Sequence, residues 1–494
     1  MRQNAQQPER PAALTAHLVR ERFAGCGDFY ARRLRLGPGG RLAAEVCWID
    51  GLVSETDVSE DVIRPLTERG RLDGVRSAAA AAERIERGAV WRGTVRQRDA
   101  LGDLTADLLA GHAALLLDGL PLALTFEVKS AQGRAVSEAA IEKAVKGPRD
   151  AFVETLRVNT ALVRRRLRTP KLKLRETTVG RESGTAVSLF YIEGIAKPET
   201  VREVQARLDA IDVDALLGAG DLEPYLLGDA ASPLPQAGHT ERPDKFAAAL
   251  LQGRVGLLAD GLPVGFLLPG TLAMLMRVPE DRADPPLMAS GLTILRWIAL
   301  LLALTLPALY AAAAVWHQEM LPTQLLVSMV EAEQDVPFGA ATVMAFLLVA
   351  FELLQEAGLR LPAPVGQTVS IIGALLVGDA AVSAKVASPI AIIVVALAGI
   401  AGYNVPNQEL ASLLRFGRLA LLLAAALGGL FALTAALALL VWYACTLESF
   451  GAAWLSPLVD SEHGALRRIF LKRAQPRDKL REVEIVWRNR RKQK

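Results

Sequence analysis

The sequence predicts an α/β (α+β) domain, duplicated and cytoplasmic, followed by an all-α membrane domain with several crossings. Three observations predict this fold class. Charged residues are dense before residue 290 and become rare from Trp297 to Thr446, as expected where a soluble part joins a membrane part. One segment of the soluble part occurs twice, and the chain ends in a strongly basic tail.

The duplication is visible as a direct alignment. Residues 106–124, ADLLAGHAALLLDGLPLAL, align without gaps on residues 248–266, AALLQGRVGLLADGLPVGF, with ten of nineteen positions identical. Self-similarity of this kind indicates two related structural units. We therefore expect one soluble subdomain over residues 1–146 and a second over residues 171–288, joined by a connecting helix within residues 147–170.

An acidic residue followed by glycine recurs at matching places in both copies. The pairs are Asp50-Gly51 with Asp118-Gly119, 68 residues apart, and Glu193-Gly194 with Asp260-Gly261, 67 residues apart. Such pairs supply the positive φ that a tight turn between two apolar strands requires. Turn formation explains these carboxylates without any reaction.

No pattern in the sequence predicts an enzyme or a catalytic residue. There is no P-loop, HExxH or GxSxG motif, and the five histidines are scattered. Three distant cysteines form neither a disulfide framework nor a metal pair. We therefore expect no cofactor and no metal centre. We also expect no nucleic-acid binding, because the basic tail shows neither a series of aromatic residues among its basic ones nor the folded module that such binding needs.

The connecting helix is predicted to begin at Asp150 and to stop before Pro170. It contains Arg164, Arg165 and Arg166 in a row, followed by Arg168. We interpret these side chains as a solvated or lipid-facing surface, with a specific anion site as the alternative.

The membrane domain, residues 289–457, starts with Trp297–Trp316, which has the length and the interfacial tryptophans of a crossing, with a kink expected at Pro307. An outer loop without lysine or arginine follows, and Phe338–Leu354 returns as a second crossing. Acidic residues in the loop either concentrate cations at a channel mouth or are merely solvated. These residues are Glu331, Glu333 and Asp335.

The third apolar segment has small or polar residues along one face when 100° is allowed per residue. They are Gln367, Ser370, Ala374, Gly378, Ala381 and Lys385. Such a stripe serves close helix packing or lines water; packing does not explain Gln367 or Lys385. Asp379 lies about 120° away from Gln367, and we expect it to contact Ser383, a neighbouring helix or another subunit.

After Pro389 a short apolar piece precedes a clear span, Leu419–Cys445. If the short piece is re-entrant, the domain has four crossings and the tail, residues 458–494, is cytoplasmic; if it crosses, there are five and the tail is outside. We favour four. From Asp460 onward the tail has twelve Lys or Arg against five Asp or Glu, so it is either solvated or rests on anionic lipid headgroups.

Several motifs in fixed order carry a resemblance to a known family. They are GPRDAFVETLRVNTALVRRRL (147–167), YIEGIAKPETV (191–201), TERPDKFAAALLQGRV (240–255), HQEMLPTQLL (317–326), FELLQEAGLRLPAPVGQTVSIIGALLVGDAAV (351–382) and SPIAIIVVALAGIAGY (388–403). The order resembles the GerA-type spore germination family, which comprises the A subunit of nutrient germinant receptors and its stage V sporulation paralogue. In the first 140 residues only CGDFY and CWIDGL match.

The resemblance implies a multi-pass protein of the spore inner membrane that forms homo-oligomers, expected to be pentamers, and a gated channel releasing monovalent cations when nutrients are sensed. B- and C-type subunits, or a small membrane partner, would complete the complex. Copies around an axis would turn the predicted stripe into a water-lined path, with Lys385 at its mouth or paired with Asp379 of a neighbouring copy. The alternatives are a non-conducting scaffold or sensory subunit, and a transporter with a site near Ser388-Pro389.

Overall fold

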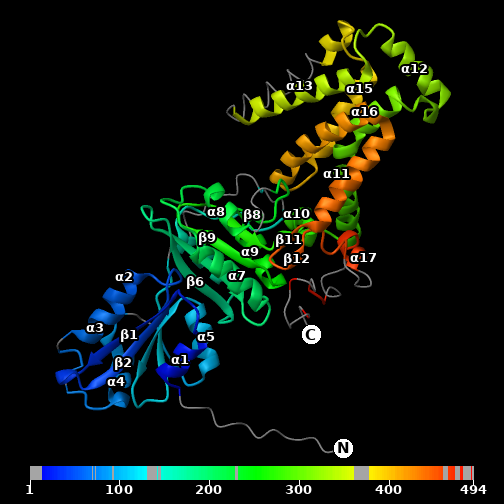
Figure 1. Ribbon diagram of the computed structural model, residues 1–494. Coiled ribbons are helices and arrows are strands. Elements are labelled where there is room, and N and C mark those ends of the chain that lie inside the picture. Colours follow the sequence, from blue (N-terminus) through cyan, green and yellow to red (C-terminus); the bar gives the residue numbers. More distant parts are fainter. Residues whose placement is uncertain are drawn as a thin grey trace, which may run out of the picture. The chain divides into compact units, whose positions relative to one another are not determined.

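The computed structural model of this 494-residue chain describes residues 14–68, 70–72, 74–91, 94–130, 142, 146–227, 232–360, 378–459, 465–472, 479–481, 485 and 491. The chain divides into two compact units (Figure 1). The first, here the sheet unit, comprises Met1–Ala230, His239–Pro269 and Lys479–Lys494. The second, here the helical unit, comprises Ala231–Gly238 and Gly270–Asp478.

The first sheet has five strands in the order β1-β2-β4-β5-β3. Their bounds are Phe29–Leu36 for β1, Leu42–Ile49 for β2, Val95–Arg98 for β3, His112–Leu117 for β4 and Ala123–Glu127 for β5. Neighbouring strands run antiparallel, and the β1–β2 register runs from Phe29 opposite Ile49 to Leu36 opposite Leu42. The β4–β5 pair is the hairpin that the Asp118-Gly119 turn predicts.

The second sheet repeats this arrangement, in the order β6-β7-β9-β10-β8. The bounds are Leu172–Val179 for β6, Thr185–Ile192 for β7, Gly238–Thr240 for β8, Val255–Ala259 for β9 and Gly265–Leu268 for β10. Each strand has its counterpart at the same place in the first sheet. The predicted fold class, a duplicated α/β part followed by a helical part, is confirmed.

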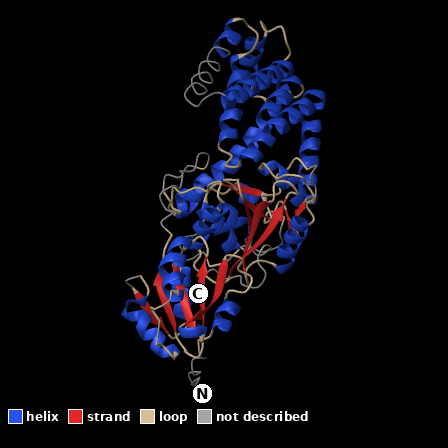
Figure 2. Cartoon of the chain, turned by 90° about the vertical axis from the view of Figure 1, so that its left-hand side faces the viewer, coloured by secondary structure: helices blue, strands red, loops and turns tan. Residues whose placement is uncertain are grey.

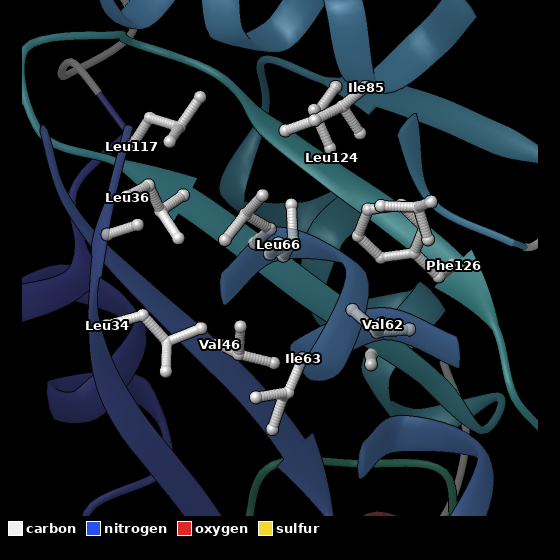
Figure 3. Close-up of a cluster of buried hydrophobic side chains, with 14 of the residues drawn as sticks. Leu34, Leu36, Val46, Val62, Ile63, Leu66, Ile85, Leu117, Leu124 and Phe126 are labelled. Carbon is white, nitrogen blue, oxygen red and sulfur yellow. The ribbon is translucent and has the colours of Figure 1, made fainter. Parts of the chain in front are cut away.

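Helices cover both faces of the first sheet. On one face, side chains of β1, β2, β4 and β5 pack against helical residues between 55 and 89, and Figure 3 shows Leu34, Val46 and Phe126 on the sheet opposite Val62 and Ile85. On the other face, Val19 and Leu104 pack against Cys47 and Ala114. The helices of the sheet unit are α1 (Ala16–Arg22), α2 (Glu55–Asp57), α3 (Arg64–Thr67), α4 (Ala78–Arg84), α5 (Leu101–Leu109), α6 (Leu156–Arg166), α7 (Pro198–Asp209), α8 (Ala219–Leu226) and α9 (Pro243–Gln252).

The helical unit contains long apolar helices that lie side by side (Figure 2). Its elements are α10 (Leu272–Leu275), α11 (Pro286–Val315), α12 (Thr323–Glu333), α13 (Ala340–Arg360), α15 (Pro389–Tyr403), α16 (Gln408–Thr446), α17 (Ala465–Phe470) and the small hairpin of β11 (Glu448–Ser449) and β12 (Ala452–Ala453). Among the described residues, α11, α13 and α16 are long and apolar enough to cross a membrane, and α15 is shorter. The outer loop was predicted without a helix, yet it contains α12.

The helix over the predicted span Leu419–Cys445 is not continuous. Helix α16 is interrupted at Gly428 and Gly429, and Gly429 has φ +61° and ψ −147°, a backbone conformation available to glycine. Gly429 lies against Trp316, where an added β-carbon would be 2.8 Å from the tryptophan Cβ. Both ends of α16 belong to one core cluster that also contains Ala299–Ala312 of α11, through Leu410 and Ala444. Helix α16 is therefore a hairpin that doubles back beyond the end of α11.

Candidate functional site

The predicted stripe lies partly outside the described residues. Gln367, Ser370 and Ala374 fall there, and their role in lining a path stays a prediction. The described part of the segment is helical over residues 378–383. Lys385 follows in a turn with φ +56°, so the helical phase does not extend to it. Placing Lys385 on the same continuous helix was wrong, because the chain leaves the helix after Ser383.

Burial separates the described residues of this segment into two faces. Ala381 is buried in a cluster with Tyr310 and Met344, so in this structure its methyl group packs inside the protomer. Gly378 is half-buried, and an added β-carbon there would lie 3.9 Å from Ile392. The opposite face is exposed and carries Asp379, Ala380, Ser383 and Ala384.

Lys385 binds a carboxylate of the predicted acidic mouth. Its Nζ lies 2.6 Å from Asp335 Oδ2, and both side chains are more than 60% exposed. Asp379, by contrast, has no hydrogen-bond or ion-pair partner within the part of the chain that the structure describes. The lysine charge is thus compensated inside the protomer, whereas none of the described residues compensates the aspartate charge.

The other two residues of the acidic mouth lie at the end of α12. Glu331 is exposed, whereas Glu333 is half-buried and accepts a hydrogen bond from the Tyr310 hydroxyl at 2.9 Å. The same hydroxyl lies 3.5 Å from Ser388 Oγ, and Ser388 caps α15 by accepting from the Ala391 N–H at 3.3 Å. Glu333 therefore joins α12 to α11 and α15.

An ion pair between a buried arginine and a half-buried glutamate joins two apolar helices, and sequence reasoning missed it. Arg418 of α16, only 4% exposed, donates from Nη2 to Glu352 Oε1 of α13, and Arg415 Nε lies 3.6 Å from Glu352 Oε2. The segment LLRFGR, with two arginines three residues apart, was a usable signal, because that spacing places both on one helix face. Glu352 by itself had no predicted partner.

The connecting helix α6 contains a second buried arginine. Arg164 is fully buried; its Nε lies 2.6 Å from Asp28 Oδ2, its Nη2 lies 2.7 Å from Asp28 Oδ1, and its Nη1 donates to the Leu172 carbonyl at 2.9 Å. The interpretation of Arg164 as solvated or lipid-facing was wrong, because Asp28 supplies a bidentate partner from the first subdomain. Arg166 pairs with Asp150 at 2.6 Å.

The connecting helix also starts later than predicted. It begins at Leu156, and residues 151–155 are not helical. Asp260 of the second-copy turn accepts a hydrogen bond from the Leu156 N–H at 2.9 Å, which satisfies a donor that a helix start leaves unpaired. The neighbouring Gly261 N–H donates to the Glu154 carbonyl at 2.7 Å.

The acidic-glycine pairs are turns, as the sequence predicts. Their glycines Gly51, Gly119, Gly194 and Gly261 have φ values between +79° and +84°. Two of the four carboxylates also contact α6: Asp260 as described, and Asp50, whose Oδ2 lies 3.0 Å from Arg157 Nε. Turn chemistry and helix contacts account for these residues.

Comparisons with known proteins agree with the sequence resemblance. Residues 17–483 match the family described as Bacillus/Clostridium GerA spore germination protein. The Bacillus subtilis (strain 168) protein YfkQ, described as an uncharacterized membrane protein, is 35% identical over 448 residues, which are 91% of this chain and 86% of that protein. Spore germination protein KA of the same organism is 32% identical over 472 residues, 94% of this chain and 86% of that protein.

A solved structure matches the N-terminal half. The crystal structure of the N-terminal domain of the A subunit of the Bacillus megaterium spore germinant receptor GerK3 is 30% identical, and covers 51% of this chain and 91% of that chain with a TM-score of 0.39. The family match extends much further, over nearly the whole chain. The chain belongs to the GerA family of spore germination proteins.

Proposed function

We propose that this chain is an A-type germinant receptor subunit of the spore inner membrane. Copies assemble as a cyclic homo-oligomer, a pentamer, whose helical units enclose a gated path for monovalent cations that opens when nutrients are sensed. B- and C-type subunits complete the receptor. The stage V sporulation paralogue, an auxiliary ion channel that amplifies the signal, is the alternative within the family.

The exposed face of residues 378–384 carries this proposal. Its side chains are Asp379, Ala380, Ser383 and Ala384, all small or polar. Elsewhere on the long helices the exposed positions include large apolar side chains suited to lipid, such as Leu353, Leu427 and Phe431. A carboxylate facing lipid costs about 2.5–3.5 kcal/mol or more at the bilayer centre, so this face is expected to meet water or another copy.

A cyclic assembly brings this face into contact with both water and a neighbouring copy. One helix with one polar face cannot enclose water, but the same face repeated around an axis can. Asp379 lies six residues before Lys385, and Lys385 forms an exposed pair with Asp335. That pair is neutral as a whole, so the uncompensated charge facing the path is negative, which favours cations.

The ends of the helical unit support a cytoplasmic location for the soluble part and the tail. Phe470 of α17 packs edge-on against Trp297, with ring centroids 5.6 Å apart, and the Lys472 N–H donates to Ser290 Oγ at 2.9 Å. Helix α16 also ends beside residues that precede α11 in the helical unit, because Tyr443 donates to Ser232 Oγ at 2.9 Å, and Ala444 shares a core cluster with Met276. The chain enters and leaves the helical unit at one end, and the basic residues at that end favour the cytoplasmic side.

Reconstitution of the full chain tests the proposal. In liposomes loaded with potassium, the oligomer, assembled with the B- and C-type subunits and exposed to nutrient, is expected to release potassium and retain chloride. Asp379→Asn is expected to reduce potassium release at least about tenfold or to weaken the oligomer, whereas Asp212→Asn, an exposed carboxylate of the sheet unit, changes neither. An oligomer that passes no potassium, with or without the B- and C-type subunits and nutrient, would favour a non-conducting scaffold.

Neighbouring genes separate the two family alternatives. B- and C-type subunit genes beside this one support the receptor subunit, and stage V sporulation genes support the auxiliary channel.

A further inference from the structure

Arg418 places a positive charge among apolar helices, where Glu352 is the carboxylate that binds it. Arg418 is 4% exposed, its Nη2 donates to Glu352, and its Nε has no partner in the described part of the chain. Its guanidinium also lies over the Phe351 ring, 5.8 Å from the centroid. Removing Glu352 would leave an arginine buried among apolar helices without a carboxylate, which is strongly unfavourable.

The half of α13 that contains Glu352 packs loosely against its neighbours. No described residue from Val349 to Gly358 is fully buried. Leu353, the residue after Glu352, is 67% exposed. Beside the ion pair, Phe351 rests on the bare backbone of Gly399 in α15, where an added β-carbon would lie 2.5 Å from the ring. A flat ring on a glycine resists sliding less than interlocked side chains do.

The far half of α13 is held differently. Val343, Met344, Leu347 and Leu348 are buried in a cluster with Ala311 and Val395. This half has an apolar core with α11 and α15. The half that contains Glu352 is held by polar contacts, namely the ion pair and a hydrogen bond from Gln355 Nε2 to the Tyr403 hydroxyl of α15 at 2.9 Å. A helix held by an apolar core in one half and by polar contacts in the other can be released in its polar half.

We propose that Glu352 and Arg418 form a latch that positions α13 against α16 and keeps the path closed. Met344 of α13 shares a buried cluster with Ala381, on the inner face of the segment that we propose to line the path. Release of the latch lets the Glu352 half of α13 move, and this shared cluster transmits the movement to residues 378–384. The latch role in gating rests on the proposed channel function; the positioning role does not.

The test uses the full chain in liposomes and measures position and flux separately. Spin labels on cysteines at the exposed positions Leu353 and Leu427, with Cys445 replaced by serine, report the separation of α13 from the turn of α16. Glu352→Gln is expected to broaden or shift this distance by about 5 Å, on the scale of one helical turn. It is also expected to raise potassium flux without nutrient at least about fivefold.

Two further variants make the result specific. Arg415→Gln removes the more distant arginine of the same carboxylate and is expected to have a clearly smaller effect on both readouts. Should Glu352→Gln fail to fold, Glu352→Leu combined with Arg418→Met removes the latch without leaving a buried charge. This double variant should fold, show the altered distance and leak.

The outcomes are distinguishable. A wild-type distance in a folded variant that lacks the ion pair overturns the latch. An altered distance in chains that never conduct retains the positioning role and contradicts the proposed channel. Restoration of the wild-type distance and flux by exchanging the two charges, Glu352→Arg with Arg418→Glu, supports the latch; no restoration in a folded protein contradicts it.

Discussion

Arg164 binds Asp28 through two hydrogen bonds, 2.6 and 2.7 Å long, and at most 1% of either side chain is exposed. Asp28 directly precedes β1 of the first sheet, and Arg164 lies in the helix that leads to the second. The Gly27 N–H donates to the Leu174 carbonyl of β6 at 2.7 Å beside this pair. The connecting helix therefore joins the two copies of the duplicated fold through a buried charge and backbone pairing.

Asp28→Asn is expected to destabilise the sheet unit by about 3–5 kcal/mol, because it leaves Arg164 buried without a carboxylate. Hydrogen-exchange mass spectrometry on the full chain should show faster exchange in peptides from α6, β1 and β6. The matched control is Asp212→Asn, which removes the exposed partner of Arg181 and should leave exchange unchanged outside its own loop. Equal exchange in Asp28→Asn and wild type would contradict the structural role of the pair.

Two equivalent turns of the duplication should respond differently to the same substitution. Gly51 and Gly194 both have φ near +80°. A β-carbon at Gly51 would lie 3.0 Å from the Arg157 carbonyl and 3.3 Å from Ala161 Cβ, whereas none of the surroundings comes within 4 Å at Gly194. Gly194→Ala is expected to cost about 1–2 kcal/mol for the left-handed conformation alone.

Gly51→Ala should cost more than Gly194→Ala, because the methyl group also displaces α6. Hydrogen exchange at the start of α6 gives the comparison, with Gly194→Ala as the control for backbone strain. Similar losses in both variants would show that α6 does not press on the Gly51 turn.

His112 should make the first subdomain sensitive to mild acid. Burial lowers the pKa of its imidazole from the ordinary value; the nearby Asp107 opposes this shift. Nδ1 lies 3.1 Å from the Asp107 carbonyl, and Nε2 has no partner in the part of the chain that the structure describes. Because the unfolded chain binds the proton more readily, stability is retained above about pH 6.5 and declines as pH falls below it.

His112→Gln should remove this decline, and His17→Gln, at an exposed position, should preserve it. Exchange rates of β4 and β5 peptides between pH 7 and pH 5, corrected for intrinsic exchange, provide the measurement. A decline of the same size in His112→Gln would assign the acid sensitivity to other groups.

Local signals in the sequence were sufficient for much of the fold. The acidic-glycine turns follow from dipeptide chemistry, and the duplication follows from alignment, so the β4–β5 hairpin and the equivalence of the two copies were predictable. The full strand order was not predicted. The position of Asp260 at the start of α6 was not predictable either, because a carboxylate from a turn 104 residues away determines where that helix begins. The burial of Arg164 depends in the same way on Asp28, 136 residues distant.

In the helical unit, too, local sequence patterns predict some elements, whereas contacts between distant residues determine others. Apolar length predicts α11 and α13, but the hydropathy of α16 does not fall at its turn, since glycines are compatible with an apolar run. The turn at Gly429 needs a glycine conformation and the close approach of Trp316. The 100° periodicity identified a polar segment around Gly378 and Asp379, yet periodicity alone cannot say where the helix ends or which face its own protomer covers.

Cysteine accessibility during conduction tests the central claim most directly. With Cys445 replaced by serine, single cysteines at Ser383, on the exposed face, and at Gly378, on the predicted stripe, are compared in potassium-releasing liposomes. Leu427, exposed on an apolar helix face, is the matched control. A positively charged thiol reagent is expected to reduce flux at least about tenfold through Ser383→Cys and to leave Leu427→Cys unaffected. Unchanged flux in fully labelled Ser383→Cys and Gly378→Cys oligomers would contradict the account that this segment lines a cation path.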